Sequence, residues 1–189
     1  MRSLSYLIFL IFTISLFSQE LKKEKESRLK KDKVPEYMLE CLQPYLSKKA
    51  TFYREVDGNK KSYEAKLQYD GGKYSIEFDD SLKLEDVELS ITIDQIDVNV
   101  KEKINAHLSH SQKFKILKIQ KQFSSDKRND REVIDEALKN KTGDIINYEL
   151  EVGIKHKGKW KFFEMTFSDV GKFLFQREIS ERTSGYVLY

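Results

Sequence analysis

The alternation of apolar and polar residues predicts β-strands over much of the chain. Every second side chain is apolar in residues 63–69 (YEAKLQY), and residues 74–78 (YSIEF) repeat this pattern after the turn at residues 70–72 (DGG). A period of two places the apolar side chains on one face of a strand, and the glycine-containing turn joins the two strands as a hairpin. By the same reasoning we expect further strands at residues 51–56, 82–93, 113–123, 147–154, 160–167 and 172–179.

An apolar residue at every third or fourth position predicts three helices, in residues 34–47, 97–109 and 124–144. Pro44 is expected to kink or shorten the first helix, and Asp97 can cap the second. The third is a short insertion between two strands, and its apolar stripe either folds back onto the protein or binds a partner. The three stripes are Met38, Leu42 and Leu46; Val100, Ile104 and Leu108; and Val133, Ile134, Ala137 and Leu138.

The two halves of the chain match each other in the same order of elements. Residues 62–67 (SYEAKL) parallel residues 147–152 (NYELEV), and residues 74–80 (YSIEFDD) parallel residues 163–169 (FEMTFSD). The helix stripes that precede these strands also correspond. We therefore predict an internal duplication of a helix followed by an antiparallel meander.

This order predicts an α+β fold. Two tandem helix-plus-antiparallel-meander repeats are expected to form one sheet, with helices packed on one face and the other face partly open. The first repeat covers residues 34–93 and the second residues 94–179, which include the insertion at residues 124–144. Residues 180–189 form a C-terminal tail, and the sequence does not decide whether it is ordered.

The first residues of the chain indicate export. Arg2 precedes an apolar run (LIFLIFTISLF), and the small residue Ser18 closes it, which is the plan of a cleaved signal peptide over residues 1–18. Residues 19–33 (QELKKEKESRLKKDK) carry an excess of positive charge in a chain whose net charge is +3. Their scarcity of apolar residues predicts a charged flexible leader. Because the rest of the chain is then close to neutral, we expect no nucleic-acid partner.

Residues that often carry catalysis or bind metals are sparse. Cys41 is the one cysteine, and we interpret it as a core residue rather than a reactive thiol. His107 and His110 lie near a predicted helix end, where solvent exposure is expected rather than zinc binding. The carboxylate pairs at residues 79–80 and 85–86 are interpreted as turn formers, and a slip in the apolar alternation predicts a β-bulge near the second pair. We predict no catalytic residue, no metal and no cofactor, and the chain is not expected to be an enzyme.

Aromatic residues are the remaining candidates for a binding surface. The chain contains 12 Phe, 10 Tyr and one Trp, and most of them belong to the core-directed positions of the strands. Tyr53, Trp160, Phe162 and Phe175 lie out of phase with these positions or flank them. We therefore assign these four to a candidate binding surface, with burial under the helices or the insertion as the alternative.

A motif typical of a known family is carried by Val34-Pro35 and by residues 63–67 (YEAKL), 71–73 (GGK) and 74–79 (YSIEFD). Its pattern resembles the PepSY-like repeats of exported Bacteroidetes proteins, which are described as similar to the β-lactamase inhibitory protein fold. The resemblance covers residues 34–179, although Asp97 replaces the usual proline at the second helix start. It implies an envelope or secreted location and a non-catalytic binding or inhibitory role.

Together these features predict a periplasmic or secreted, non-catalytic binding protein. It is expected to inhibit or modulate another envelope or secreted protein through the open sheet face. The alternative is a carrier of a small apolar ligand, held between the helices and the sheet. No integral membrane span is expected after signal cleavage, and neither the partner nor the oligomeric state follows from the sequence.

Overall fold

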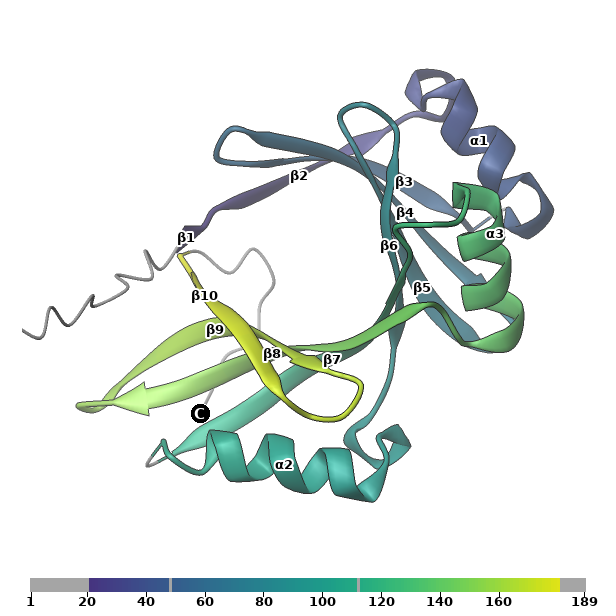
Figure 1. The fold of residues 1–189 in the computed structure, drawn as a ribbon. Helices are drawn as coiled ribbons and strands as arrows, with labels where there is room; N and C mark the ends of the chain where they lie inside the picture. The colour runs from purple at the N-terminus through teal and green to yellow at the C-terminus, as the bar shows by residue number, and fades with distance from the viewer. Residues whose placement is uncertain (1–20, 48, 112, 181–189) are drawn as a thin grey trace, which may run out of the picture.

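The computed structural model describes residues 21–47, 49–111 and 113–180, which form a mostly β structure (Figure 1). The predicted signal peptide and residues 181–189 of the tail lie outside these residues. Within them, no helix is long and apolar enough to cross a lipid bilayer. The strands are β1 (Leu21–Lys22), β2 (Glu24–Leu29), β3 (Thr51–Asp57), β4 (Lys60–Tyr69), β5 (Gly72–Asp79), β6 (Leu84–Ser90), β7 (Phe114–Ser124), β8 (Ile145–His156), β9 (Lys159–Ser168) and β10 (Phe173–Ile179). The helices are α1 (Glu36–Leu42), α2 (Val98–Leu108) and α3 (Asp130–Asp135), with short helical turns η1 (Lys31–Lys33), η2 (Gln43–Tyr45), η3 (Ile93–Gln95) and η4 (Glu136–Asn140).

All ten strands belong to one sheet, in the order β1-β10-β9-β8-β7-β6-β5-β4-β3-β2. The two end strands, β1 and β2, follow each other in the chain with only Lys23 between them. β1 pairs in parallel with β10, and β2 pairs antiparallel with β3. The N-terminal segment therefore bridges both edges of the meander, and the sheet curls into a nearly closed barrel (Figure 1).

This architecture corrects the predicted α+β fold. The structure is a β-rich, nearly closed barrel with three short helices, instead of a sheet with helices on one face and the other face partly open. The face that was expected to be open is the inside of the barrel. The flexible leader predicted for residues 19–33 is also wrong for residues 21–29, which form β1 and β2. These residues form strands without an apolar pattern, because backbone hydrogen bonds to β3 and β10 hold them in place.

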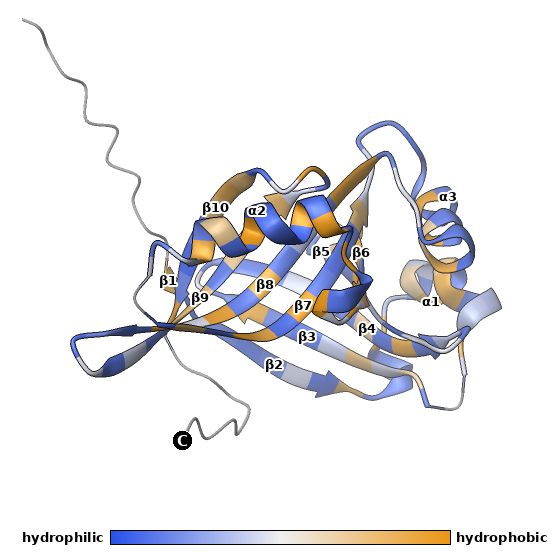
Figure 2. Cartoon of the chain, turned by 90° about the horizontal axis from the view of Figure 1, so that it is seen from below, coloured by the Kyte–Doolittle hydropathy of each residue, from blue (hydrophilic) through white to orange (hydrophobic). Residues whose placement is uncertain are grey.

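Two hydrophobic cores lie on the outside of the barrel, each beneath helices. The first joins α1, α3 and η4 to strands β3 to β7, and the second joins α2 to strands β7 to β9. Hydrophobic and hydrophilic residues alternate along these strands, as the bands of colour in Figure 2 show. Because one side of each strand feeds these outer cores, its other side must face the interior of the barrel.

The predicted helices form where the apolar stripes place them. Cys41 is buried in α1, and Pro44 falls in the helical turn η2, which ends the short helix. The insertion helix folds back onto the protein, because its side chains Ile134 and Leu138 are fully buried in the first core. A hydrogen bond at its start, from Glu132 N to the side chain of Asn129, caps the helix.

The hairpins β4–β5 and β8–β9 have the same register at the positions that the predicted duplication aligns. The pairs are Tyr63 with Phe78 and Tyr148 with Phe167. The turns that follow them also share a left-handed residue at the equivalent place, Leu82 (φ 68°) and Gly171 (φ 78°). Equal registers are expected if the two halves arose by duplication. The duplication itself stays a prediction.

Candidate binding site inside the barrel

The polar positions of the strands line the inside of the barrel. In β4, Glu64 and Lys66 alternate with the core residues Ala65 and Leu67. Residues paired directly across two strands lie on the same face of a sheet, so the register extends this polar face around the barrel. The pairs that continue it are Glu64–Glu77, Glu77–Asp86, Glu88–Gln122, Gln120–Glu149, Glu149–Thr166 and Glu164–Arg177.

Several of these carboxylates are buried and held by neutral donors. Glu64 is 4% exposed and Glu88 is 5% exposed. The hydroxyl of Ser75 donates a hydrogen bond to Glu64, and the side-chain amide of Gln120 donates one to Glu88. Gln122 Nε2 donates a further bond to Glu88 Oε1 at 3.1 Å. These donors fix the orientation of the carboxylates, but they do not neutralise them.

Two cations from the ends of the described chain enter the same interior. Lys22 of β1 forms an ion pair with the buried Glu164 and a second with Glu24 at 2.8 Å. Arg177 of β10 pairs with Glu164 at 2.6 Å and with Asp57 at 3.2 Å. Burial would raise the pKa of Glu164, but the charges of Lys22 and Arg177 outweigh it and hold that pKa below its usual value. Glu164 is therefore a compensated carboxylate.

Other interior carboxylates are compensated less, because Lys22 lowers the pKa of Glu77 and Glu149 by too little to offset the effects that raise it. Burial, followed by repulsion from neighbouring carboxylates, raises the pKa of Glu77, Asp86 and Glu149 well above the usual value. The same two causes raise the pKa of Glu55 to about 11. Asp86 Oδ1 is inaccessible to solvent and has no hydrogen-bond partner among the described residues. Such groups either keep a proton at neutral pH or receive positive charge from outside the chain.

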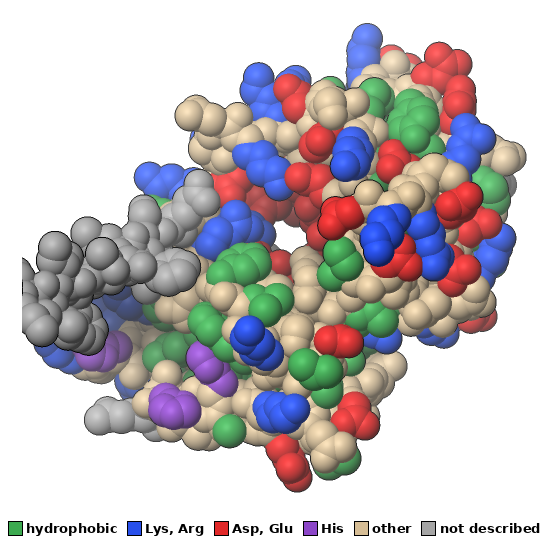
Figure 3. Space-filling model, viewed as in Figure 1, with side chains coloured by type: hydrophobic (Ala, Val, Ile, Leu, Met, Phe, Trp, Pro, Cys, Tyr) green, Lys and Arg blue, Asp and Glu red, His purple; other side chains and the backbone are tan. Residues whose placement is uncertain are grey.

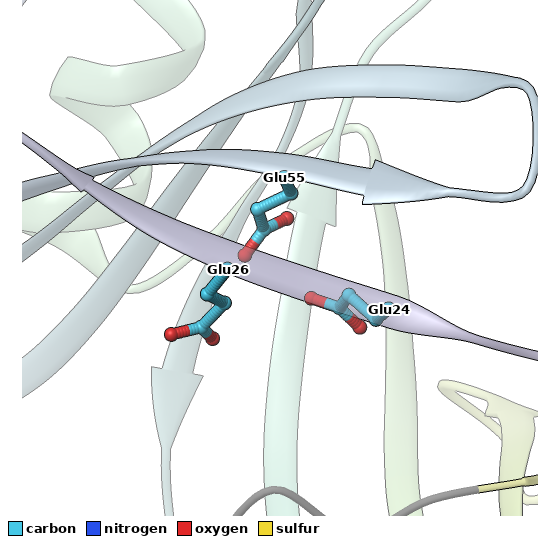
Figure 4. A group of neighbouring side chains, drawn as sticks. All are labelled: Glu24, Glu26 and Glu55. Carbon is cyan, nitrogen blue, oxygen red and sulfur yellow. The ribbon is translucent and has the colours of Figure 1, made fainter.

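Two groups of three carboxylates bring their oxygens close enough to hold a cation. Figure 4 shows the first, in which Glu24 and Glu26 of β2 lie beside Glu55 of β3. The ligand atoms within each group lie within 4.8 Å of one another, and hard cations such as Ca²⁺ prefer carboxylate oxygens. The second group consists of Glu77, Asp86 and Glu88.

The interior opens to solvent. Figure 3 shows an opening in the middle of the molecule, with Asp and Glu side chains gathered along one side of it. A cavity of about 480 Å³ lies at the end of the barrel where β4 ends and β5 begins. It is lined by Lys49, Thr51, Glu64, Lys66, Leu67, Gln68, Lys73, Tyr74, Ser75, Ser90, Lys118 and Gln120. A second cavity, of about 670 Å³, lies beside the end of β2 and the start of β3.

In the first cavity the negative charge is buried and the positive charges are exposed. Glu64, Ser75 and Gln120 are buried, and we call them the cavity floor. Lys49, Lys73 and Lys118 are exposed, and we call them the lysine rim. A molecule that enters from solvent therefore passes the lysine rim before it reaches the buried carboxylate.

The four aromatic residues selected from the sequence share the inner face but do not form one surface. Tyr53 pairs with Glu64 and lies under Lys66, whose Nζ is 4.7 Å from the ring centre. Phe175 of β10 pairs with Thr166 of β9. Only two of the four come together, and they do so around Gly153. A Cβ atom built there would lie 3.3 Å from Phe162 and 3.4 Å from Trp160.

Sequence reasoning missed the carboxylates of the interior. Asp79 is the turn former that was predicted, because its Oδ1 accepts hydrogen bonds from Ser81 N and Lys83 N. Asp86 is not, because its side chain lies inside the barrel beside Glu77. The available signal was the repeated Glu at the polar positions of several strands, namely Glu64, Glu77, Glu88, Glu149 and Glu164.

The comparisons with known proteins show the fold alone. No family model matches the sequence, and a search of curated proteins finds no match. A DUF2874 family protein from Bacteroides uniformis superposes with a TM-score of 0.52 at 14% identity, over 77% of this chain and 89% of that one. A protein from Bacteroides eggerthii that is inferred to be periplasmic superposes with a TM-score of 0.51 at 12% identity, over 78% of this chain and 90% of that one.

A BLIP-like protein from Bacteroides fragilis is more distant in structure. It superposes with a TM-score of 0.46 at 15% identity, over 81% of this chain and 92% of that one. That similarity is too low to support an argument. The PepSY-like resemblance therefore stays a prediction, whereas the likeness to Bacteroides proteins of the DUF2874 type is a finding about the fold.

Proposed function

We propose that this chain is an exported, non-catalytic binding protein that takes a small polar ligand into the cavity at the end of the barrel. The observation that carries the proposal is the cavity floor, where Glu64 is 4% exposed yet lines a space of about 480 Å³. Specific small-molecule sites are concave, have volumes of roughly 300–1,000 Å³, and place a few fixed polar groups at their base.

The location of the protein rests on two supports. The N-terminal pattern of one basic residue, an apolar run and a small residue is that of a secretion signal. In addition, the structurally similar protein from Bacteroides eggerthii is inferred to be periplasmic. We therefore place the protein in the periplasm or outside the cell.

The structure gives less support to the two functions expected from the sequence. An open sheet face for a protein partner does not exist in this form, because β1 and β2 enclose it. A small apolar ligand between helices and sheet would compete with the side chains of Met38, Leu42 and Leu138, which are fully buried there. Most of the residues that line the first cavity are polar or charged, which favours a polar ligand.

Native mass spectrometry tests this proposal. The full chain is exported from a Gram-negative host, purified from the periplasmic fraction, and sprayed under non-denaturing conditions. We expect a bound small molecule that is lost in Glu64→Gln and retained in Glu102→Gln, which changes an exposed carboxylate on α2. If wild type and Glu64→Gln carry the same ligand, or if the wild type carries none and periplasmic small molecules do not raise its melting temperature, the proposal is wrong.

A further inference from the structure

The charged residues of the first cavity indicate the chemical class of its ligand. The inference drawn from it rests on the proposed function and goes one step further. From the separation of charge between the cavity floor and the lysine rim, we infer that the ligand is a zwitterion with a primary ammonium group and a carboxylate. Free amino acids and short peptides are the two sources of this chemistry.

The cavity floor is suited to an ammonium group. Glu64 accepts one hydrogen bond from Ser75, whereas its Oε2 atom is buried and accepts none among the described residues. Lys66 Nζ lies 3.0 Å from that oxygen without the alignment of a hydrogen bond, and it is shared with Glu26 at 2.7 Å. When Lys66 turns fully to Glu26, the ammonium group of a ligand, which carries three donors in a small volume, can take its place and donate a hydrogen bond to this oxygen.

Carboxyl groups behind the floor strengthen this preference. Glu77 lies directly across from Glu64, and Gln120 of the floor donates its hydrogen bond to Glu88. The charge of Glu64 contributes to the raised pKa of Glu77, which shows that the carboxylates act on one another. A positive group at Glu64 would therefore also favour the ionised form of these neighbouring carboxyl groups, in place of the protons that they otherwise keep.

The lysine rim is suited to an anionic group at the outer end of the ligand. Lys118 has one distant ion pair, with Glu151 at 3.8 Å. Among the described residues, no carboxylate lies within ion-pair distance of Lys49 or Lys73. Exposed lysines are weak sites on their own, but here three of them surround one entrance.

The cavity floor and the lysine rim also disfavour ligands of other classes. A polyamine would meet the lysine rim first and be repelled there. An inorganic anion or a simple organic acid would offer no donor to Glu64 Oε2 and would bring negative charge towards it. An apolar ligand would displace water from Glu64 and from the lysine rim without replacing the hydrogen bonds that this water makes.

Three dipeptides that differ only in their ends test the inference by isothermal titration calorimetry. Ala-Ala has both charges, N-acetyl-Ala-Ala lacks the ammonium, and Ala-Ala-amide lacks the carboxylate. We expect Ala-Ala to bind and each blocked form to bind at least tenfold more weakly. Glu64→Gln should weaken Ala-Ala at least tenfold, whereas Glu102→Gln should leave it unchanged. Free alanine, measured in parallel, distinguishes an amino-acid site from a peptide site.

The outcomes separate this inference from the function on which it rests. Equal binding of Ala-Ala and N-acetyl-Ala-Ala, or binding of spermidine in place of Ala-Ala, would overturn the zwitterion and leave a cavity-binding protein. Absence of binding by Ala-Ala and alanine would also overturn it, even if mass spectrometry finds a different ligand that depends on Glu64. Absence of every ligand in both experiments would overturn the inference and the proposed function together.

Discussion

The substitution Glu77→Gln probes the interior carboxylates with little change in shape. Glu77 of β5 lies between Glu64 and Asp86 across the sheet. Burial, followed by repulsion from Glu88 and Glu64, raises its pKa well above the usual 4.5. Glutamine keeps the size of the side chain and removes the charge. In wild type, the folded state binds a proton at Glu77 at a pH where the unfolded chain releases it, and this binding costs stability as the pH rises. The glutamine variant does not bind this proton and avoids the cost.

The sign and size of the effect follow from proton linkage. A raised carboxylate pKa means that the folded state binds more protons, so its contribution is most favourable below the usual pKa of 4.5 and is lost as the pH rises towards the folded-state value. One extra proton changes the free energy of unfolding by at most about 1.4 kcal/mol per pH unit. Between pH 5 and pH 7 the ceiling for one group is therefore about 3 kcal/mol. Because Glu77 is only half-buried by surface area and its neighbours titrate with it, we expect about 1–2 kcal/mol.

Urea denaturation followed by the fluorescence of Trp160 measures this difference. In chelating buffer at pH 7, Glu77→Gln should be about 1–2 kcal/mol more stable than wild type, and the gap should nearly close at pH 5. Glu102→Gln, at an exposed site, is the matched control and should follow wild type at every pH. A difference between Glu77→Gln and wild type that does not change with pH, or a variant that is less stable at pH 7, would refute the reasoning.

Three other changes test the core, a strained turn and the aromatic pair. Leu138→Ala removes a fully buried side chain of the insertion from the first core, and should cost about 2–5 kcal/mol in urea denaturation; a loss below about 1 kcal/mol would mean that the insertion does not pack as described. Leu82→Gly relieves a positive φ of 68° and should raise stability by about 0.5–1 kcal/mol, whereas a loss would show that the leucine side chain compensates for the backbone. The double change Trp160→Ala, Phe162→Ala, on β9 and outside the lining of the first cavity, should leave Ala-Ala binding unchanged, and a loss of binding would show that the ligand reaches this pair.

Elements with a one-sided apolar pattern could be predicted from the sequence. The bulge expected near residues 85–86 occurs where the β5–β6 register shifts, and Asp97 caps α2 through Asn99 N. The stripe of the insertion identified the side chains that enter the first core. In each case the burial of apolar side chains imposes a period that can be read without knowing the neighbours.

The closure of the barrel could not be predicted in this way. The strand β2 (EKESRL) is polar on both faces, so its pairing with β3 depends on backbone hydrogen bonds that leave no side-chain pattern. Its charged residues have the composition of a solvated leader. In the structure a charge of the neighbouring strand β1, that of Lys22, forms an ion pair with the buried Glu164.

The candidate site was missed for a related reason. Glu64, Glu77 and Glu88 occupy the polar positions of strands, which in an open sheet would face water. Only the curvature of the sheet turns that face into an interior where carboxylates gather. The aromatic residues selected instead do lie on the inner face, because their phase is opposite to the core, but they are spread over β3, β9 and β10.

Cross-linking of β1 to β10 tests most directly whether the N-terminal segment closes the barrel. Leu21 and Glu178 are register partners in these strands, so the variant Leu21→Cys, Glu178→Cys should form a disulfide under mild oxidation and resist alkylation at both positions. The native Cys41 is buried and should not compete. The control Leu21→Cys, Val98→Cys, with an exposed partner on α2, should remain open. Alkylation of the test pair as rapid and complete as that of the control would contradict a closed barrel.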